Sequence, residues 1–141
     1  MALLPDGVWR LSAALHESAH ALLSWVIDLR EARVVLARDR RSLTGGLTTA
    51  SGNADVQLWS AMWLSAGYVQ ADWLKRQGYI HPELLYCVLE MGASGDSQVV
   101  DSYVADGYVL DRDQAISDAL QVLALPSAAA ALSTLAGELL R

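Results

Sequence analysis

The sequence predicts a mainly α protein of the α+β class, folded as a single domain over residues 1–141. Three observations support this. Apolar residues recur every three or four positions over most of the chain, which is typical of amphipathic helices. One stretch near residues 32–50 is instead rich in β-branched residues and glycine. The chain is 53% hydrophobic and 18% charged, with no internal repeat or linker-like segment, so the composition is that of a globular domain.

The N-terminal elements are a helix followed by a small sheet or hairpin. Helical spacing extends from Trp9 to about Leu29. The segment ARVVLARDR then predicts a strand. In the following RSLTGGLTTASGN, the pair Gly45-Gly46 indicates either a hairpin turn or a strand with a glycine bulge.

The rest of the chain is predicted to be helical. A second helix through VQLWSAMWLSAGYVQADWLKRQ has Asn53 or Asp55 as its N-cap and ends at Gly78. The ambiguous segment YIHPELLYCVLEM predicts a short helix from near Pro82. GASGDSQVVDSYVADGY predicts a loop that enters a helix, with Ser94 as N-cap and Gly107 as terminator. Two last helices are separated at Pro126.

Charge and cysteine usage narrow the classes of partner. A net charge of −6 and a pI near 4.8 argue against nucleic acid or an anionic membrane as the main partner. The single cysteine, Cys87, allows no internal disulfide and fits a reducing compartment. No apolar run approaches the ~20 residues of a membrane span. We therefore expect a cytoplasmic protein without a signal peptide or a membrane span.

The segment LHESAHALLSWV carries the chemistry in the first helix. His16 and His20 are four residues apart, so they lie on one helix face and can offer two imidazole nitrogens to one ion. Glu17 lies off that face, yet close enough to take a proton from a metal-activated water. The alternative interpretation is a helix interior that tolerates three polar residues. A catalytic zinc needs a third protein ligand, for which His81, Glu83, Glu90 and Asp72 are open candidates.

The order of four motifs resembles the peptidase domain of the FtsH-type ATP-dependent zinc metalloproteases. These motifs are HESAHALLSWV, ARVVLARDRRSLTGGLTTAS, LSAGYVQADWL and GASGDSQVVDSYVA, and the similarity extends from about Leu11 to Leu140. The chain departs from the family pattern at Ala19, Tyr68 and Gly95. It contains no Walker motif and no ATPase module, so the resemblance is to the peptidase part alone.

This resemblance implies a zinc-dependent endopeptidase, a hydrolase acting on unfolded or extended polypeptides. It implies His16, His20 and Asp96 as Zn²⁺ ligands and Glu17 as the catalytic base. It places Asp96 at the opening of a helix. We expect the strand from Leu43 to Ala50 to pair with substrate, with Thr44, Gly45, Gly46 and Leu47 as the binding residues. An ordinary glycine-kinked hairpin without a binding role is the alternative for this segment. The expected partners are a polypeptide substrate and either a separate ATPase or further copies of the chain. A catalytically silent zinc-binding regulatory or adaptor domain is the alternative function.

Overall fold

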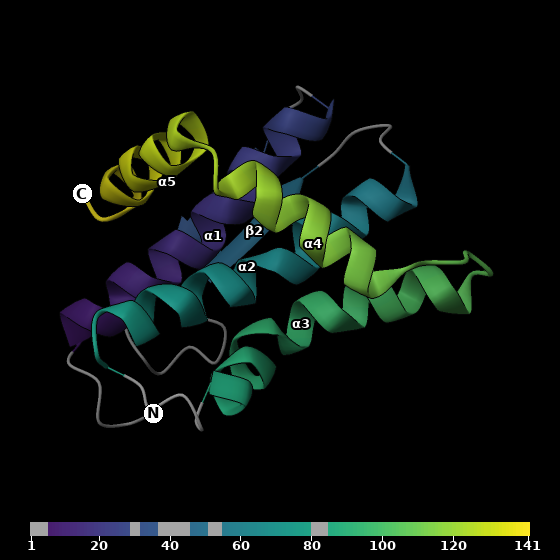
Figure 1. Cartoon of the computed structure of the whole chain (residues 1–141), viewed down its shortest axis with the longest axis horizontal. Coiled ribbons are helices and arrows are strands. Elements are labelled where there is room, and N and C mark those ends of the chain that lie inside the picture. The colour runs from purple at the N-terminus through teal and green to yellow at the C-terminus, as the bar shows by residue number, and fades with distance from the viewer. Residues whose placement is uncertain (1–5, 29–31, 37–45, 51–54, 80–84) are drawn as a thin grey trace.

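The computed structural model describes residues 6–28, 32–36, 46–50, 55–79 and 85–141. Five helices dominate this part of the chain, which confirms the mainly α prediction. Helix α1 (Asp6–Asp28) and helix α2 (Val56–Arg76) lie side by side at the centre. Helices α3 (Leu85–Ala105) and α4 (Arg112–Leu123) pack on α2, whereas α5 (Pro126–Leu139) packs on α1 (Figure 1).

Two short strands follow α1 in the chain and contact it. Strand β1 (Ala32–Leu36) and strand β2 (Gly46–Ala50) form an antiparallel two-stranded sheet. The register runs without a bulge from the Ala32–Ala50 pair to the Leu36–Gly46 pair. The antiparallel geometry agrees with the hairpin interpretation, while Gly45 itself lies outside the described residues.

Local sequence signals fix most of the helix ends. The Asp55 carboxylate accepts hydrogen bonds from the backbone N–H groups of Gln57 and Leu58, so Asp55 is the N-cap of α2. Gly78 follows α2 with φ of 77°, a conformation that favours glycine. Gly107 ends α3 in the same way, with φ of 97°. Pro126 is the first residue of α5, where its missing N–H costs no helical hydrogen bond.

The main core lies where α1 and α2 meet α4 and α5. Buried small residues on the two central helices allow their backbones to approach closely, and the leucines and Met62 fill the remaining volume. The buried apolar residues of this core are Ala19, Leu22, Leu23, Ala61, Met62, Ala66, Ala115, Ala119 and Leu123. The result is a rigid frame in which one face of α1 is held against α2.

The segment around Asp96 differs from the prediction. Residues 85–105 form one helix, so GASGD is not a loop, Ser94 is not an N-cap and Asp96 does not open a helix. Packing of α3 along α2 outweighs the weak helix propensity of glycine and serine. At Gly95 an added Cβ would meet no atom within 4 Å, so no close contact demands a glycine there.

None of the described helices is alone long and apolar enough to cross a membrane. Helices α4 and α5 meet that criterion only as a pair, across a bend of 86°.

Candidate metal centre

Helix α1 presents two histidines toward the inside of the protein. His16 is 5% exposed and His20 is 1% exposed. Their rings meet edge to face, with centroids 4.9 Å apart. This is the geometry expected of positions one helical turn apart, and it directs both Nε2 atoms to the same side.

Asp96 on α3 completes the cluster. Its Oδ2 atom lies 3.0 Å from His16 Nε2 and 3.1 Å from His20 Nε2. The three candidate ligand atoms all lie within 4.8 Å of one another, so the cluster could hold a metal ion. The side chain of Asp96 keeps 15% exposure, which opens the cluster toward solvent on the α3 side. The structure therefore brings together the three predicted ligands, with Asp96 lying 80 residues after His16 and 76 after His20 in the chain.

The far side of each imidazole ring faces a hydrogen-bond acceptor on α2. His20 Nδ1 lies 3.0 Å from the backbone carbonyl oxygen of Met62. His16 Nδ1 lies 3.1 Å from Gln70 Oε1. A carbonyl oxygen can only accept, so each Nδ1 carries a proton and donates it. Trp63 contacts the His20 ring at a centroid distance of 4.9 Å and restricts its rotation.

These tautomers determine the chemistry at the centre of the cluster. With Nδ1 protonated in the neutral rings, both Nε2 atoms direct lone pairs toward a carboxylate oxygen. Three acceptors at about 3 Å repel one another unless a cation or a proton lies among them. One proton can serve only one of the two nitrogens at a time, whereas one metal ion satisfies all three atoms together.

Hydrogen bonds and charges within the cluster favour an ionised Asp96 and a protonated His16. Burial raises the pKa of Asp96, but the hydrogen bonds and positive charge that His16 and His20 supply in their protonated forms outweigh it and lower that pKa to about 2. For His16, burial lowers the pKa, but the hydrogen bond and charge of Asp96, with help from Glu17 and Gln70, leave it raised. Asp96 is thus an anion at neutral pH, as a metal ligand must be.

Glu17 is buried beside the cluster and is not among its three ligand residues. Its side chain is 5% exposed. Its negative charge is one of the causes that raise the pKa of His16, which shows that the two groups are electrostatically close. A carboxylate near the ligands but outside the set is what a proton-accepting role requires.

Asp72 stands apart from the cluster, and several other predicted residues lie outside the described part of the chain. Asp72 is exposed on α2 and pairs with Arg76, so it is not a third ligand. His81 and Glu83 lie outside the described residues, as does the side chain of Glu90. Of the predicted substrate-binding residues, Thr44 and Gly45 also lie outside them. Gly46 and Leu47 belong to β2, opposite Leu36 and Val35.

The sequence interpretation missed the groups on α2 that orient the histidines. Met62 acts through its backbone, so its identity carries no signal. Gln70 does carry one, because it shares a helix face with the buried residues Ala66, Gly67 and Leu74. A polar side chain on such a face requires a buried partner, and His16 is that partner.

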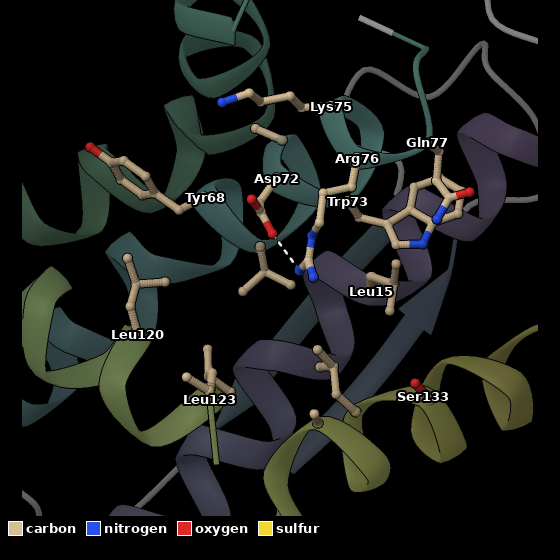
Figure 2. A pocket seen from close by; sticks show the side chains of 15 residues that line it. Leu15, Tyr68, Asp72, Trp73, Lys75, Arg76, Gln77, Leu120, Leu123 and Ser133 are labelled. Carbon is tan, nitrogen blue, oxygen red and sulfur yellow. Dashed lines mark ion pairs between the residues drawn. The ribbon is translucent and has the colours of Figure 1, made fainter. Parts of the chain in front are cut away.

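A cavity of about 620 Å³ lies elsewhere, among α1, α2, α4 and α5. Leu15, Leu120 and Leu123 form the apolar part of its wall, and the ion pair of Arg76 with Asp72 forms part of the polar side (Figure 2). None of His16, Glu17, His20 or Asp96 lines it. The space is therefore separate from the polar cluster.

Comparisons with known proteins leave the family open. No family model, curated protein or solved structure matches this chain significantly. The resemblance to FtsH-type peptidases rests on the motifs in the sequence.

Proposed function

We propose that this protein is a zinc metallopeptidase of the FtsH peptidase type, an endopeptidase that hydrolyses unfolded or extended polypeptides. The observation that carries the proposal is the convergence of His16, His20 and Asp96 from two helices, with Glu17 beside them. The motif order that resembles the family supports it independently.

The donor set fits zinc better than the other common divalent ions. Two imidazole nitrogens and one carboxylate oxygen suit zinc, whereas calcium and magnesium prefer oxygen ligands alone. Three protein ligands leave one position of a tetrahedral ion for water or substrate, which is the pattern of catalytic sites. The acceptors behind both rings match the outer-shell partners that orient zinc-binding histidines.

In this proposal each residue has a defined role. His16 and His20 bind zinc through Nε2 and Asp96 binds it through a carboxylate oxygen. Zinc supplies Lewis-acid chemistry, lowering the pKa of water and polarising the scissile carbonyl. Glu17 accepts the proton of the attacking water and later donates it to the leaving amine.

Strand β2 is the proposed docking edge for substrate. In the described sheet, β1 pairs with only one side of β2, and both strands contact the helix that carries the histidines. An extended polypeptide could add to the other edge by main-chain hydrogen bonds, at Gly46 and Leu47 of the predicted binding residues. The predicted Thr44 and Gly45 lie outside the described residues. Such pairing requires an extended chain, so folded substrates need a separate ATPase to unfold them.

Burial of the cluster favours a second candidate, a zinc-binding regulatory or adaptor domain without turnover. Glu17 and His16 are each 5% exposed, so among the described residues of the cluster Asp96, at 15%, offers a substrate the most exposed approach. A zinc-binding domain without catalytic activity would need the three metal ligands but not Glu17 as a general base.

The Glu17→Gln variant separates the two candidates. Glutamine keeps the side-chain volume but accepts no proton, so zinc content and melting temperature should stay close to those of the parent. Cleavage of a denatured protein substrate should fall by about 10²–10⁴-fold, the usual contribution of general acid–base catalysis.

The matched control is His16→Ala, which should lose zinc, stability and cleavage together because a ligand is removed. An unchanged cleavage rate in Glu17→Gln would remove Glu17 from the mechanism. A parent protein that binds zinc but cuts no denatured substrate, with or without an ATPase, would favour the regulatory domain.

A further inference from the structure

A chain of three hydrogen bonds leads from the backbone of α1 to the back of His16. The Ser12 hydroxyl donates to the carbonyl oxygen of Trp9 at 2.8 Å. The side-chain amide of Gln70 donates from Nε2 to Ser12 Oγ at 3.1 Å. Gln70 Oε1 then accepts from His16 Nδ1, also at 3.1 Å. The chain crosses from α1 to α2 and back.

The direction of this chain is set at its backbone end. The Trp9 carbonyl only accepts, so the single proton of the Ser12 hydroxyl points to it. Ser12 Oγ can then only accept from Gln70, which turns the amide nitrogen toward Ser12 and the amide oxygen toward His16. The oxygen in turn requires a proton on His16 Nδ1. Because Ser12 is fully buried, bulk water does not compete for these bonds.

The reversed chain has a different chemical consequence. If the Ser12 hydroxyl turned to Gln70 and the amide flipped, the amide nitrogen would donate to His16 Nδ1. The imidazole proton would then move to Nε2 and point at Asp96, where it would block a metal ion. The bond from Ser12 to Trp9 would be lost in that arrangement, and the Nε2–H would gain Asp96 Oδ2 as its acceptor. A metal ion in the cluster takes the place of that proton, so the first direction is favoured when metal is bound.

We propose that Ser12 and Gln70 are positioning residues that hold His16 in its Nδ1–H tautomer, with the Nε2 lone pair directed at the metal position. The inference rests on the proposed function in one respect, namely that a metal occupies the cluster. The tautomer itself follows from the hydrogen bonds.

His20 provides an internal reference for this arrangement. Its Nδ1 donates to the backbone carbonyl of Met62, an acceptor that no side-chain substitution removes. The two histidines are thus oriented by different kinds of acceptor. Only the acceptor of His16 belongs to a side chain, so a substitution at Gln70 should change the tautomer of His16 and leave that of His20 unchanged.

The test is nitrogen-15 NMR of the imidazole rings in the zinc-free protein at alkaline pH, where both rings are neutral. Relative to the variants below, the parent should show more of the Nδ1–H tautomer at His16, although an Nε2–H donated to Asp96 competes with it in the zinc-free protein. His20 should show the Nδ1–H tautomer. In Gln70→Met, which keeps the side-chain length but loses the amide, His16 should shift toward Nε2–H while His20 stays unchanged. Gln70→Glu, which keeps an acceptor at this position, should retain the parent pattern, and Ser12→Ala should give a partial shift.

Zinc binding measured on the same proteins gives a second readout. Affinity should fall by about 10–100-fold in Gln70→Met, as for loss of other outer-shell partners, and much less in Gln70→Glu. If zinc-free protein unfolds, NMR of the zinc-loaded parent replaces the first measurement, and both rings should bind through Nε2.

The outcomes separate this inference from the proposed function. A parent with only Nε2–H on His16, metal binding through His16 Nδ1, or a Gln70→Met protein with the parent tautomer would each overturn the positioning role. A parent with the expected tautomers that binds no zinc would instead overturn the zinc assignment and leave the hydrogen-bond chain intact.

Discussion

The polar cluster between α1 and α3 and the cavity beside α4 and α5 are built in opposite ways. In the cluster, charged and polar side chains are buried and each has a directional partner, so little freedom remains. Around the cavity the wall combines leucine and alanine side chains with an exposed ion pair between Arg76 and Asp72, whose side chains are 74% and 53% exposed.

This difference indicates where the chemistry lies. Burying polar groups without partners is costly, so a buried cluster of this kind persists only where its groups are mutually satisfied or bind a ligand. The cavity has volume, but the ion pair in its wall is screened by water. Convergent donor atoms, more than empty space, single out the cluster of His16, His20 and Asp96 as the candidate metal centre.

The largest expected effect is the loss of zinc in Asp96→Ala. Removal of the third ligand should weaken zinc binding by more than about 100-fold, because loss of outer-shell partners alone costs up to that factor. Competition with a chromophoric chelator would measure the change.

Asp72→Ala is the matched control for this variant, since it makes the same chemical change near the cavity. Its zinc affinity should equal that of the parent, and its free energy of unfolding should change by less than about 1 kcal/mol, as for other exposed ion pairs. Equal losses of zinc in both variants would remove the distinction between the two regions.

A smaller effect should appear in the pH dependence of the zinc-free protein. The lowered pKa of Asp96 contributes stability above its usual value of 3.8, and this is lost as the pH falls toward 2. The raised pKa of His16 contributes stability below 6.5, and this is lost as the pH rises through the folded-state value. The cluster therefore contributes most between these limits, with about 2 kcal/mol from Asp96.

Urea denaturation across this pH range, with and without zinc, would measure the contribution. Zinc requires neutral imidazoles, so the stabilisation by zinc should grow as the pH rises. In Asp96→Asn the acidic limb of the zinc-free profile should disappear. A zinc-free parent whose stability increases steadily from acid to alkaline pH would contradict the account.

The sequence predicted local features better than the relation between helices. Three local features depend on only a few neighbouring residues each. They are the spacing of His16 and His20, the N-cap at Asp55 and the helix break at Pro126. The helix through Asp96 was predicted wrongly as a loop because the glycines and serines of GASGD favour turns when considered alone. Its packing against α2 is a tertiary effect.

The contacts of Gln70 and of the Met62 carbonyl with the two histidines could not be predicted from the sequence, for a related reason. Periodicity shows which face of α2 is buried, but not how that face is rotated against α1. Whether Gln70 meets His16 or another residue depends on that rotation. The direction of the hydrogen-bond chain through Ser12 depends further on side-chain conformations that only the folded structure defines.

The most direct test of the central claim is X-ray absorption at the zinc edge, combined with the metal content of protein purified without added metal. We predict one zinc per chain, with two imidazole nitrogens at about 2.0–2.1 Å and a carboxylate oxygen at about 2.0–2.2 Å. A folded protein that contains no zinc and takes up none on titration would contradict the claim, as would a coordination shell with a sulfur donor in place of the carboxylate.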